Sequence, residues 1–470
     1  MMGNYKYLFK NIGLLAISQF ATKILVFLLV PLYTSVLSTA EYGTYDLFST
    51  TVNLLIPILT LNVSESIIVY TMDTKYSNRD VISVGIKYSI IGFGLSFVFI
   101  GINYILGIFP ALNQFWYFLP IMLLLSTLNT TFSYFARGID KVKHTAISGV
   151  LSSAVLITCN IIFLLVLKIG LLGYFVSNIL ALAVQIIYLC VTCDILHYVS
   201  ISFDKKTENE MRQFSYPLIA NTIGWWINNS SDRYIVTLMC GIAANGIYSV
   251  GYKIPSILNM FQSIFSQAWT ISAVKDFDAD DKNGFFSNMY NMYNCGMVII
   301  CSAVIISARL LAYILYARDF FTAWKFVPWL TIAIVFGSLS GFLGGVFSAV
   351  KDSKMFGKST VIGALINLIL NVVLVYFVGA LGAAIATTIS FFVVWLIRLK
   401  HVRKYIKVQM RLIRDMGAYS VLILQGLLLY LFNDGILLYT LEIILFCMLV
   451  FMFREETIGN IKRLRRKLSK

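Results

Sequence analysis

The chain has 470 residues, of which 59% are hydrophobic and 13% are charged, and its formal net charge is +15. A soluble protein of this length cannot bury so much apolar surface, and about a quarter of its residues would be charged. The positive charge does not indicate nucleic-acid binding, because the basic residues gather in every second loop between apolar runs. These runs are continuous and about twenty residues long, which matches membrane-spanning helices and excludes the alternating, ten-residue strands of a membrane barrel. The composition therefore predicts an all-α, polytopic helical membrane protein.

About fourteen apolar runs are long enough to span a bilayer. We expect the helices at residues 12–33, 44–70, 81–106, 115–136, 145–167, 171–193, 215–240, 245–270, 286–308, 326–349, 360–378, 381–399, 413–432 and 436–453. The first run lacks the small-residue cleavage site of a signal peptide, so we expect it to remain as an anchor. The even number of helices places both termini on one side of the membrane. The loops on that side carry about 29 Lys and Arg residues and the opposite loops about four, so both termini are predicted to be cytoplasmic.

An internal repeat relates the first half of the chain to the second. Residues 37–45 resemble residues 240–248, with Ala, Gly and Tyr at the same positions in each segment. Later, Leu172-Gly173 and Leu381-Gly382 each follow a similar apolar segment that begins with Asn. Both copies run in the same direction, which predicts two six-helix lobes in parallel repeat and two additional C-terminal helices. The corresponding domains are residues 1–200, 201–405 and 406–453, followed by a basic cytoplasmic tail at 454–470.

The stretch from Phe214 to Lys253 carries the polar residues that are hardest to place in a membrane. A charge at the centre of a spanning helix costs about 2.5–3.5 kcal/mol. In the seventh predicted helix, residues recur at spacings of four, three and four: Asn221, Trp225, Asn228 and Asp232. This spacing predicts one polar face with aromatic residues beside it, which suits a sugar. The alternative is a structural Asp–Arg pair, with asparagines that join neighbouring helices.

We expect a binding path lined by residues from several of these helices. The candidate substrate-binding residues are Lys23, Arg233, Lys253, Asn221, Trp225, Asn228, Asn229, Asn53 and Gln19. Glu65 and Asp232 are the candidates for coupling transport to an ion gradient. Three of the five charges predicted inside the membrane are positive, which favours an anionic substrate.

No catalytic or cofactor-binding pattern was found in the sequence. The chain has three histidines, all predicted in or beside cytoplasmic loops, and no Ser-His-Asp, Cys-His or metal-ligand constellation can be assembled. It also lacks the GxxxxGK[ST] loop that binds nucleotide phosphates. We therefore predict a protein that is not an enzyme and that has no catalytic residues, metal or cofactor.

Several segments resemble a known family of exporters. The first predicted helix ends in Pro31-Leu32-Tyr33-Thr34, and Glu41-Tyr42-Gly43 follows. The seventh contains Pro217-Leu218-Ile219-Ala220-Asn221 and then Trp225-Trp226-Ile227-Asn228-Asn229-Ser230-Ser231-Asp232-Arg233-Tyr234. Over nearly its whole length, the chain resembles the polysaccharide-transport branch of the multidrug/oligosaccharidyl-lipid/polysaccharide exporter superfamily. Within that branch it is most similar to the Wzx-type flippases of O-antigen or capsular repeat units.

The resemblance implies a flippase of the bacterial inner membrane. Such a protein moves an undecaprenyl-pyrophosphate-linked oligosaccharide to the periplasmic leaflet by alternating access. Lys23, Arg233 and Lys253 would correspond to the cationic cavity of the family. The implied partners are the lipid-linked substrate, membrane lipids, a polysaccharide polymerase and a chain-length regulator. Many Wzx-type members are described with twelve helices, so a fourteen-helix chain departs from that pattern and matches the number in lipid II flippases.

Three other functions are weighed against this one. A multidrug or cation antiporter of the same superfamily would have a net acidic site, whereas the candidate site here is net basic. A lipid II flippase would carry more arginines in its cavity. A membrane polysaccharide polymerase would need a large extracytoplasmic loop or a soluble catalytic domain, and neither is predicted.

Overall fold

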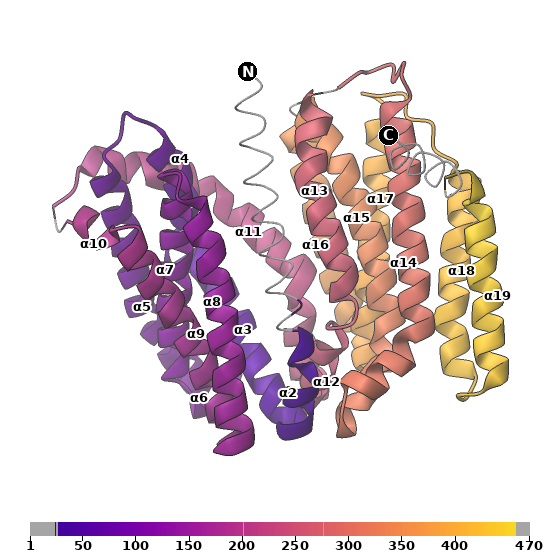
Figure 1. Ribbon diagram of the computed structural model, residues 1–470, viewed down its shortest axis with the longest axis horizontal. Coiled ribbons are helices and arrows are strands. Elements are labelled where there is room, and N and C mark those ends of the chain that lie inside the picture. Colours follow the sequence, from indigo (N-terminus) through magenta and orange to yellow (C-terminus); the bar gives the residue numbers. More distant parts are fainter. Residues whose placement is uncertain (1–23, 25–26, 201, 276, 351, 457–470) are drawn as a thin grey trace, which may run out of the picture. The chain divides into compact units, whose positions relative to one another are not determined.

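The computed structural model describes residues 24, 27–200, 202–275, 277–350 and 352–456. Within these ranges the regular structure is helical, without strands (Figure 1). The chain divides into two compact units, Met1–Trp226 and Ile227–Lys470. This boundary falls inside one long helix, α11, so each unit holds one part of it. The domain boundaries expected from the sequence remain predictions.

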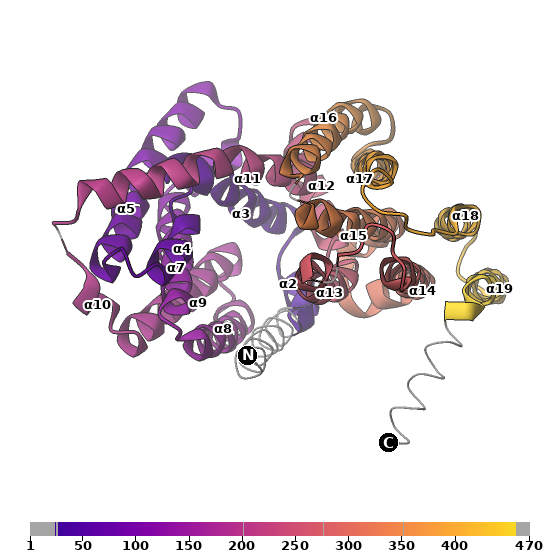
Figure 2. The same ribbon diagram turned by 90° about the horizontal axis from the view of Figure 1, so that it is seen from above.

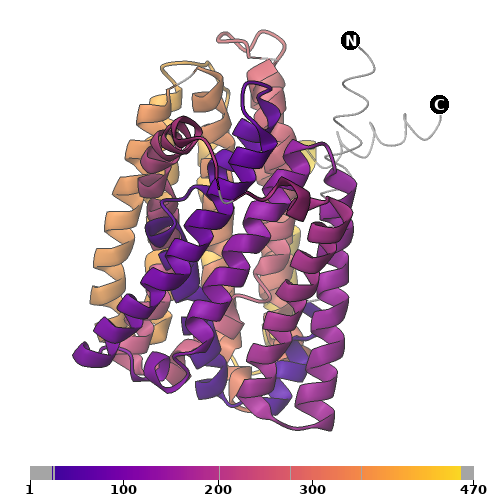
Figure 3. The ribbon, with the colours of Figure 1, turned by 90° about the vertical axis from the view of Figure 1, so that its left-hand side faces the viewer.

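The first unit holds the helices from α2 to the first part of α11 (Figure 3). Their bounds are α2 Val30–Val36, α3 Thr39–Leu59, α4 Ser64–Met72, α5 Asn78–Leu106, α6 Pro110–Gln114, α7 Phe118–Gly138, α8 Val142–Asn160, the π-helix η1 Ile161–Val166, α9 Gly170–Thr192, α10 Ile195–Tyr198 and α11 Lys205–Cys240. A buried apolar cluster joins α4, α5, α7, α9 and α11 in this unit, and Ile67, Val81 and Phe135 are among its fully buried members.

The second unit holds the rest of α11 and all later helices (Figure 2). Their bounds are α12 Ile242–Gly251, α13 Ser256–Lys275, α14 Phe285–Leu315, the 3₁₀ helix η2 Arg318–Phe326, α15 Val327–Ala349, α16 Ser353–Val378, α17 Ala380–Val402, α18 Leu412–Leu431 and α19 Ile436–Met452. The last two helices form a hairpin that packs against α14.

The described helices confirm the predicted all-α, multi-pass membrane architecture. By length and composition, nine helices in the described ranges can cross a membrane, or ten if α3 and α4 form one bent span. α19, at 17 residues, is a shorter apolar helix. The count of about fourteen stays a prediction, since much of the first predicted span lies outside the described residues. α11 is not one of these nine apolar helices, because its polar residues lower its mean hydropathy.

Two of the predicted spans are not continuous helices, which corrects the sequence prediction. The predicted helix 44–70 is broken after Leu59, and α3 and α4 are bent by 56°. The predicted helix 245–270 is broken between Gly251 and Ser256. Pro57 precedes the first break and Pro255 lies in the second. Proline lacks the N–H that the helix needs and disrupts the preceding turn, whereas the apolar pattern continues through both breaks.

The helices of each unit pack in the same pairwise order. In the first unit α5 packs on α7, α4 on α7, α7 on α9, and α8 on α9. In the second unit the corresponding pairs are α14 with α15, α13 with α15, α15 with α17, and α16 with α17. The shared order supports the repeat that the sequence predicts. The breaks lie at different positions in the two units. In the first unit the helix is broken after the 21 residues of α3, and in the second after the 10 residues of α12.

Asp352 caps the start of α16 outside the apolar span. Its carboxylate accepts hydrogen bonds from the Met355 N–H (3.0 Å) and from the Tyr405 hydroxyl (2.7 Å). These two donors hold the pKa of the carboxyl below its usual range. A carboxyl with a lowered folded-state pKa stabilises the fold above its unfolded pKa, and this contribution is lost as pH falls through the folded pKa.

We therefore expect Asp352→Asn to be less stable than the parent protein at neutral pH, with a difference that disappears in acid. The difference should shrink as pH falls below about 4, the ordinary pKa of aspartate. Thermal unfolding of both proteins at a series of pH values measures this. Tyr405→Phe keeps the Met355 donor and should show a smaller pH-dependent difference. A difference that is constant over the whole pH range would contradict the cap.

Candidate functional site

The first part of α11 is held to its unit by polar contacts near its N-terminus. Glu208 pairs with Lys87 at 2.6 Å and accepts a hydrogen bond from the Tyr88 hydroxyl at 3.1 Å. Two residues later, Glu210 accepts a hydrogen bond from the Tyr76 hydroxyl at 2.5 Å. This bond raises the pKa of Tyr76 to about 12, because the neutral phenol is the donor. The contacts fix the register of α11 against α5 and the loop before it.

The middle of α11 contacts the broken second helix of the same unit. The Trp226 indole N–H donates to the carbonyl of Thr50 at 3.1 Å, and the Asn62 side chain donates to Thr222 Oγ1 at 3.2 Å. Asn62 lies in the turn between α3 and α4, with a positive φ of 55°. Asn221 is exposed, and Trp225 is 39% exposed. The α3–α4 break therefore supplies a polar partner for α11.

The second part of α11 buries three of its polar residues, Asn228, Ser231 and Asp232. Asn228 is 6% exposed and donates to the carbonyl of Thr360 at 3.2 Å. Asp232 is 1% exposed and accepts hydrogen bonds from the hydroxyls of Tyr248 and Tyr252, both at 2.6 Å. A buried carboxylate needs such donors, since an unpaired one would be strongly destabilising. These bonds join α11 to α12 and α16 in the second unit.

The predicted stripe on α11 is thus divided into two parts with different surroundings. Its first two members, Asn221 and Trp225, are exposed, whereas Asn228 and Asp232 are in the interior of the second unit. Arg233 is partly buried, and its Cζ lies 5.2 Å from the ring centre of Tyr252. Asp232 also accepts a bond from the Arg233 backbone N–H at 2.9 Å.

The remaining candidate residues lie on other elements. Asn53 is exposed on α3, and Asn229 is exposed on α11. Glu65 is exposed on α4 and accepts a hydrogen bond from the Tyr134 hydroxyl of α7 at 3.2 Å. Lys253 is partly buried in the turn between α12 and α13. Gln19 and Lys23 lie outside the described residues.

Sequence reasoning missed a buried polar chain next to Asp232. Ser231 Oγ lies 3.4 Å from Asn367 Oδ1, and the Asn371 amide donates to the same oxygen at 2.9 Å. The Asn367 amide in turn donates to Thr387 Oγ1 at 3.4 Å. Asn367 and Asn371 are four residues apart on α16, a spacing that could have predicted a shared buried face. The chain joins α11, α16 and α17 within the second unit.

The described residues contain no group of three or more His, Cys, Asp or Glu side chains placed to hold a metal ion. The polar chain beside Asp232 offers amide and hydroxyl oxygens, together with one carboxylate. Such groups can bind the hydroxyls of a sugar or a hard cation.

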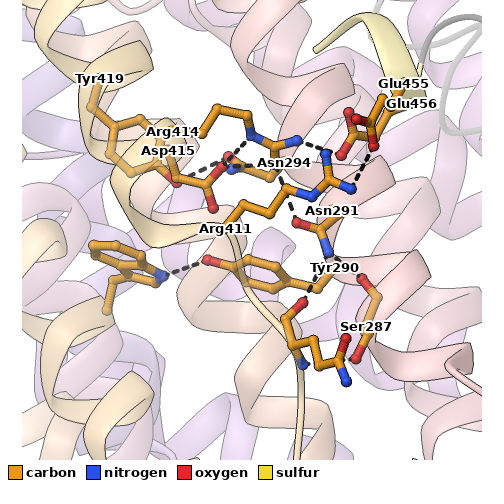
Figure 4. A network of polar contacts seen from close by, with 12 residues as sticks. Ser287, Tyr290, Asn291, Asn294, Arg411, Arg414, Asp415, Tyr419, Glu455 and Glu456 are labelled. Atoms are coloured by element: carbon orange, nitrogen blue, oxygen red, sulfur yellow. Dashed lines mark hydrogen bonds and ion pairs between the residues drawn. The ribbon is translucent and has the colours of Figure 1, made fainter. Parts of the chain in front are cut away.

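A second polar network was also missed, at one end of α14 and the C-terminal hairpin (Figure 4). Arg414 is at its centre and bonds Asp415 at 2.8 Å, Asn291 at 3.1 Å, and Glu456. The Tyr419 hydroxyl donates to Asn294 at 3.0 Å. Asp415 is fully buried, so the network fixes α18 and the residues after α19 to α14. The network lies at a helix end, next to a loop. Basic residues are common in such loops, so the sequence does not indicate that Arg414 is part of a buried pair.

Solved structures with the same fold are membrane transporters. The lipid II flippase MurJ, in an inward closed conformation, aligns with a TM-score of 0.68 at 14% identity and covers 95% of this chain and 99% of its own. A multidrug resistance transporter of the MATE family, in an inward-facing conformation, aligns with a TM-score of 0.66 at 13% identity and covers 86% of this chain and 99% of its own. At these identities the similarity shows the fold.

One curated relative is similar in sequence. It is the probable low-salt glycan biosynthesis flippase of Haloferax volcanii, with 21% identity over 207 residues. The alignment covers 43% of this chain and 44% of the relative, so the match spans less than half of that protein.

The family assignment comes from the sequence of the first unit and the beginning of the second. The family model described as polysaccharide biosynthesis protein matches residues 8–270. This is more than half of the chain and includes all of α11 and most of α13. The chain is therefore a multi-pass membrane protein that belongs to the polysaccharide biosynthesis protein family.

Proposed function

We propose that this protein is a flippase for a lipid-linked oligosaccharide. Its substrate would be an undecaprenyl-pyrophosphate-linked repeat unit of O-antigen, capsule or exopolysaccharide, moved from the cytoplasmic to the periplasmic leaflet of the inner membrane. The observation that carries the proposal is the match of residues 8–270 to the polysaccharide biosynthesis family. The flippase name of the Haloferax relative and the transporter fold support it.

The proposed orientation has both termini in the cytoplasm, in agreement with the distribution of basic residues among the loops. The polymerase and chain-length regulator that act on the flipped repeat unit would be its functional partners. Alternating access would involve the two repeated helix sets, each packed in the same pairwise order.

The basic candidates suit the pyrophosphate of such a substrate. The planar guanidinium of an arginine such as Arg233 can bind phosphate oxygens in pairs. Arg233 is partly buried beside Asp232 and the Tyr252 ring, where the low dielectric strengthens its field. Lys23 and Lys253 would add positive charge, and the exposed Asn221, Asn229, Asn53 and Trp225 would contact sugar. Glu65 and Asp232 remain proposals for ion coupling.

Arg233→Ala is expected to abolish or strongly reduce surface polysaccharide while the protein still inserts. Loss of a hydrogen bond to a charged group removes about 1.5–3 kcal/mol, which corresponds to about tenfold or more. The measurement is complementation of a flippase-deletion strain, scored as polysaccharide at the cell surface and normalised to the amount of protein in the membrane.

Arg212→Ala is the matched control, because Arg212 is exposed on the same helix. It should leave polysaccharide near the parent level. Normal polysaccharide in Arg233→Ala would remove Arg233 from the mechanism. Failure of the parent protein to complement in every host tested, together with drug resistance in an efflux-deficient host, would contradict the flippase and indicate an antiporter.

A further inference from the structure

The α18–α19 hairpin contacts α14 through polar side chains at three levels along the helices. At one end is the network around Arg414 (Figure 4). At the other end, Arg309 of α14 pairs with Asp434 at 2.8 Å and donates to the carbonyls of Phe432 and Leu429. A third polar group lies between these two ends. It differs from both because it contains a glutamate but no arginine or lysine.

The middle group consists of one residue from each helix: Ser302 of α14, Gln425 of α18 and Glu442 of α19. Ser302 donates to Gln425 Oε1 at 2.8 Å, and the Gln425 amide lies 3.5 Å from the backbone carbonyl of Glu442. All three side chains are fully buried. The next two residues of α19, Ile443 and Ile444, point away from Glu442 round the helix and are more than half exposed. The glutamate therefore faces the other two helices, and the apolar side of α19 faces outward.

Neither oxygen of the Glu442 carboxylate makes a hydrogen bond of normal geometry, and the Gln425 amide is the one donor close enough to act on it. Within the described ranges Glu442 is the one acidic residue with both oxygens buried and without such a bond. Asp415 and Glu456 each have one unpaired oxygen, but the other oxygen of each bonds Arg414. Asp232 is bonded by two tyrosine hydroxyls, and Glu65 is exposed.

No cation is placed to neutralise this carboxylate within the three helices as described. Arg309 is seven residues from Ser302, about 10 Å along α14, and is already paired with Asp434. Arg414 is eleven residues from Gln425, about 16 Å along α18. The other titratable groups nearest in sequence on the three helices are neutral or weakly acidic: Cys301, Tyr419, Tyr430, Tyr439 and Cys447.

A buried carboxylate with one weakly placed neutral donor and no cation is far less stable than the neutral acid. We propose that Glu442, together with Gln425 and Ser302, forms a proton-binding site in the α14–α18–α19 group. The carboxylic acid holds its proton in the conformation shown. When α19 moves and admits water, the O–H bond breaks, the proton passes to water, and the carboxylate keeps the electron pair. The Gln425 amide is the nearest donor available to stabilise that carboxylate.

This site would also give the transporter a route to proton coupling, a step that rests on the proposed function. The hairpin lies at one side of the second unit (Figure 2), so its movement against α14 can load and empty Glu442 without breaking the polar chain beside Asp232. Proton binding itself can be tested without any glycan substrate.

Infrared spectroscopy of the purified full-length chain tests the proton directly. The parent protein at neutral pH should show the C=O stretch of a protonated carboxylic acid that is absent from Glu442→Gln. The band should shift in D₂O, which shows that the proton exchanges. Glu455→Gln is the control, because Glu455 is exposed and paired with Arg411 at 2.5 Å, and it should retain the band. Glu442→Leu is a second variant in case Glu442→Gln does not fold. It also lacks the carboxyl group, so its infrared spectrum should lack the same band.

No difference between the parent and Glu442→Gln would overturn the proposal, as would a band in the folded protein that does not shift in D₂O. In proteoliposomes, an imposed pH gradient should accelerate flipping by the parent protein and have no effect on Glu442→Gln. Flipping that is absent from both proteins would contradict the proposed function and leave the infrared result as the test of Glu442. If the pH gradient accelerates flipping equally in both proteins, Glu442 does not couple transport to protons.

Discussion

Replacing Arg414 with alanine is expected to lower the free energy of unfolding by about 3–5 kcal/mol. The guanidinium is 12% exposed and bonds Asp415 and Glu456, whose side chains are 0% and 10% exposed. Its removal leaves two carboxylates in an apolar interior without their shared cation. It also removes the donor to Asn291, so α18 and the segment after α19 lose the contacts with α14 that Arg414 makes, whereas the Tyr419–Asn294 bond remains.

Arg411→Ala is the matched control for this change. Arg411 lies three residues earlier and pairs with Glu455 at 2.5 Å, but the two side chains are 50% and 61% exposed. An exposed ion pair contributes about 0–1 kcal/mol, so this variant should unfold close to the parent. Thermal and denaturant unfolding in detergent, followed by tryptophan fluorescence, measures both. Equal destabilisation by the two substitutions would show that burial of the network does not determine its contribution.

Some of this structure follows from local chemistry that can be read in the sequence. Long apolar runs predict the positions of α5, α7, α9 and α14–α19, because a spanning helix must satisfy its backbone internally and face lipid with apolar side chains. The polar residues of α11 also stand out, since they are costly in a membrane.

The parts that could not be predicted depend on which surfaces meet. Periodicity places Asn221 and Asp232 on one face of α11, but that face passes from exposed surroundings into the interior of the second unit. The buried Asn367 and Thr387 match that interior, yet they are more than a hundred residues away in the chain. Glu442 was overlooked because its single charge lies in a run that is otherwise apolar, and one charge does not change the prediction of a span.

Gly382→Ala is expected to destabilise the second unit by at least about 3 kcal/mol, above the usual range for an added methyl group. An alanine Cβ at this position would overlap the carbonyl oxygen and the carbonyl carbon of Leu374. These are backbone atoms of α16, so no side-chain rotation can relieve the contact. The α16–α17 hairpin would have to open, and it carries Asn367 and Thr387.

Two other glycines provide controls on the reasoning. Gly357 of α16 has open space where its Cβ would lie, so Gly357→Ala should be neutral or stabilise by up to about 1 kcal/mol through helix propensity. Gly173 is the repeat counterpart of Gly382, but its Cβ would meet side-chain atoms of Phe163 at 2.8 Å and Ile169 at 2.9 Å.

The Ile169 side chain can rotate away, and the overlap with the Phe163 Cβ is smaller than the backbone overlap at Gly382. Gly173→Ala should therefore be less destabilising than Gly382→Ala. Unfolding midpoints and membrane abundance of the three variants give the order. If Gly173→Ala and Gly382→Ala are equally unstable, the loss arises from the turn that both repeats share. If Gly382→Ala alone collapses, the close backbone approach of α16 and α17 is specific to the second unit, where that hairpin also has to hold the polar chain beside Asp232.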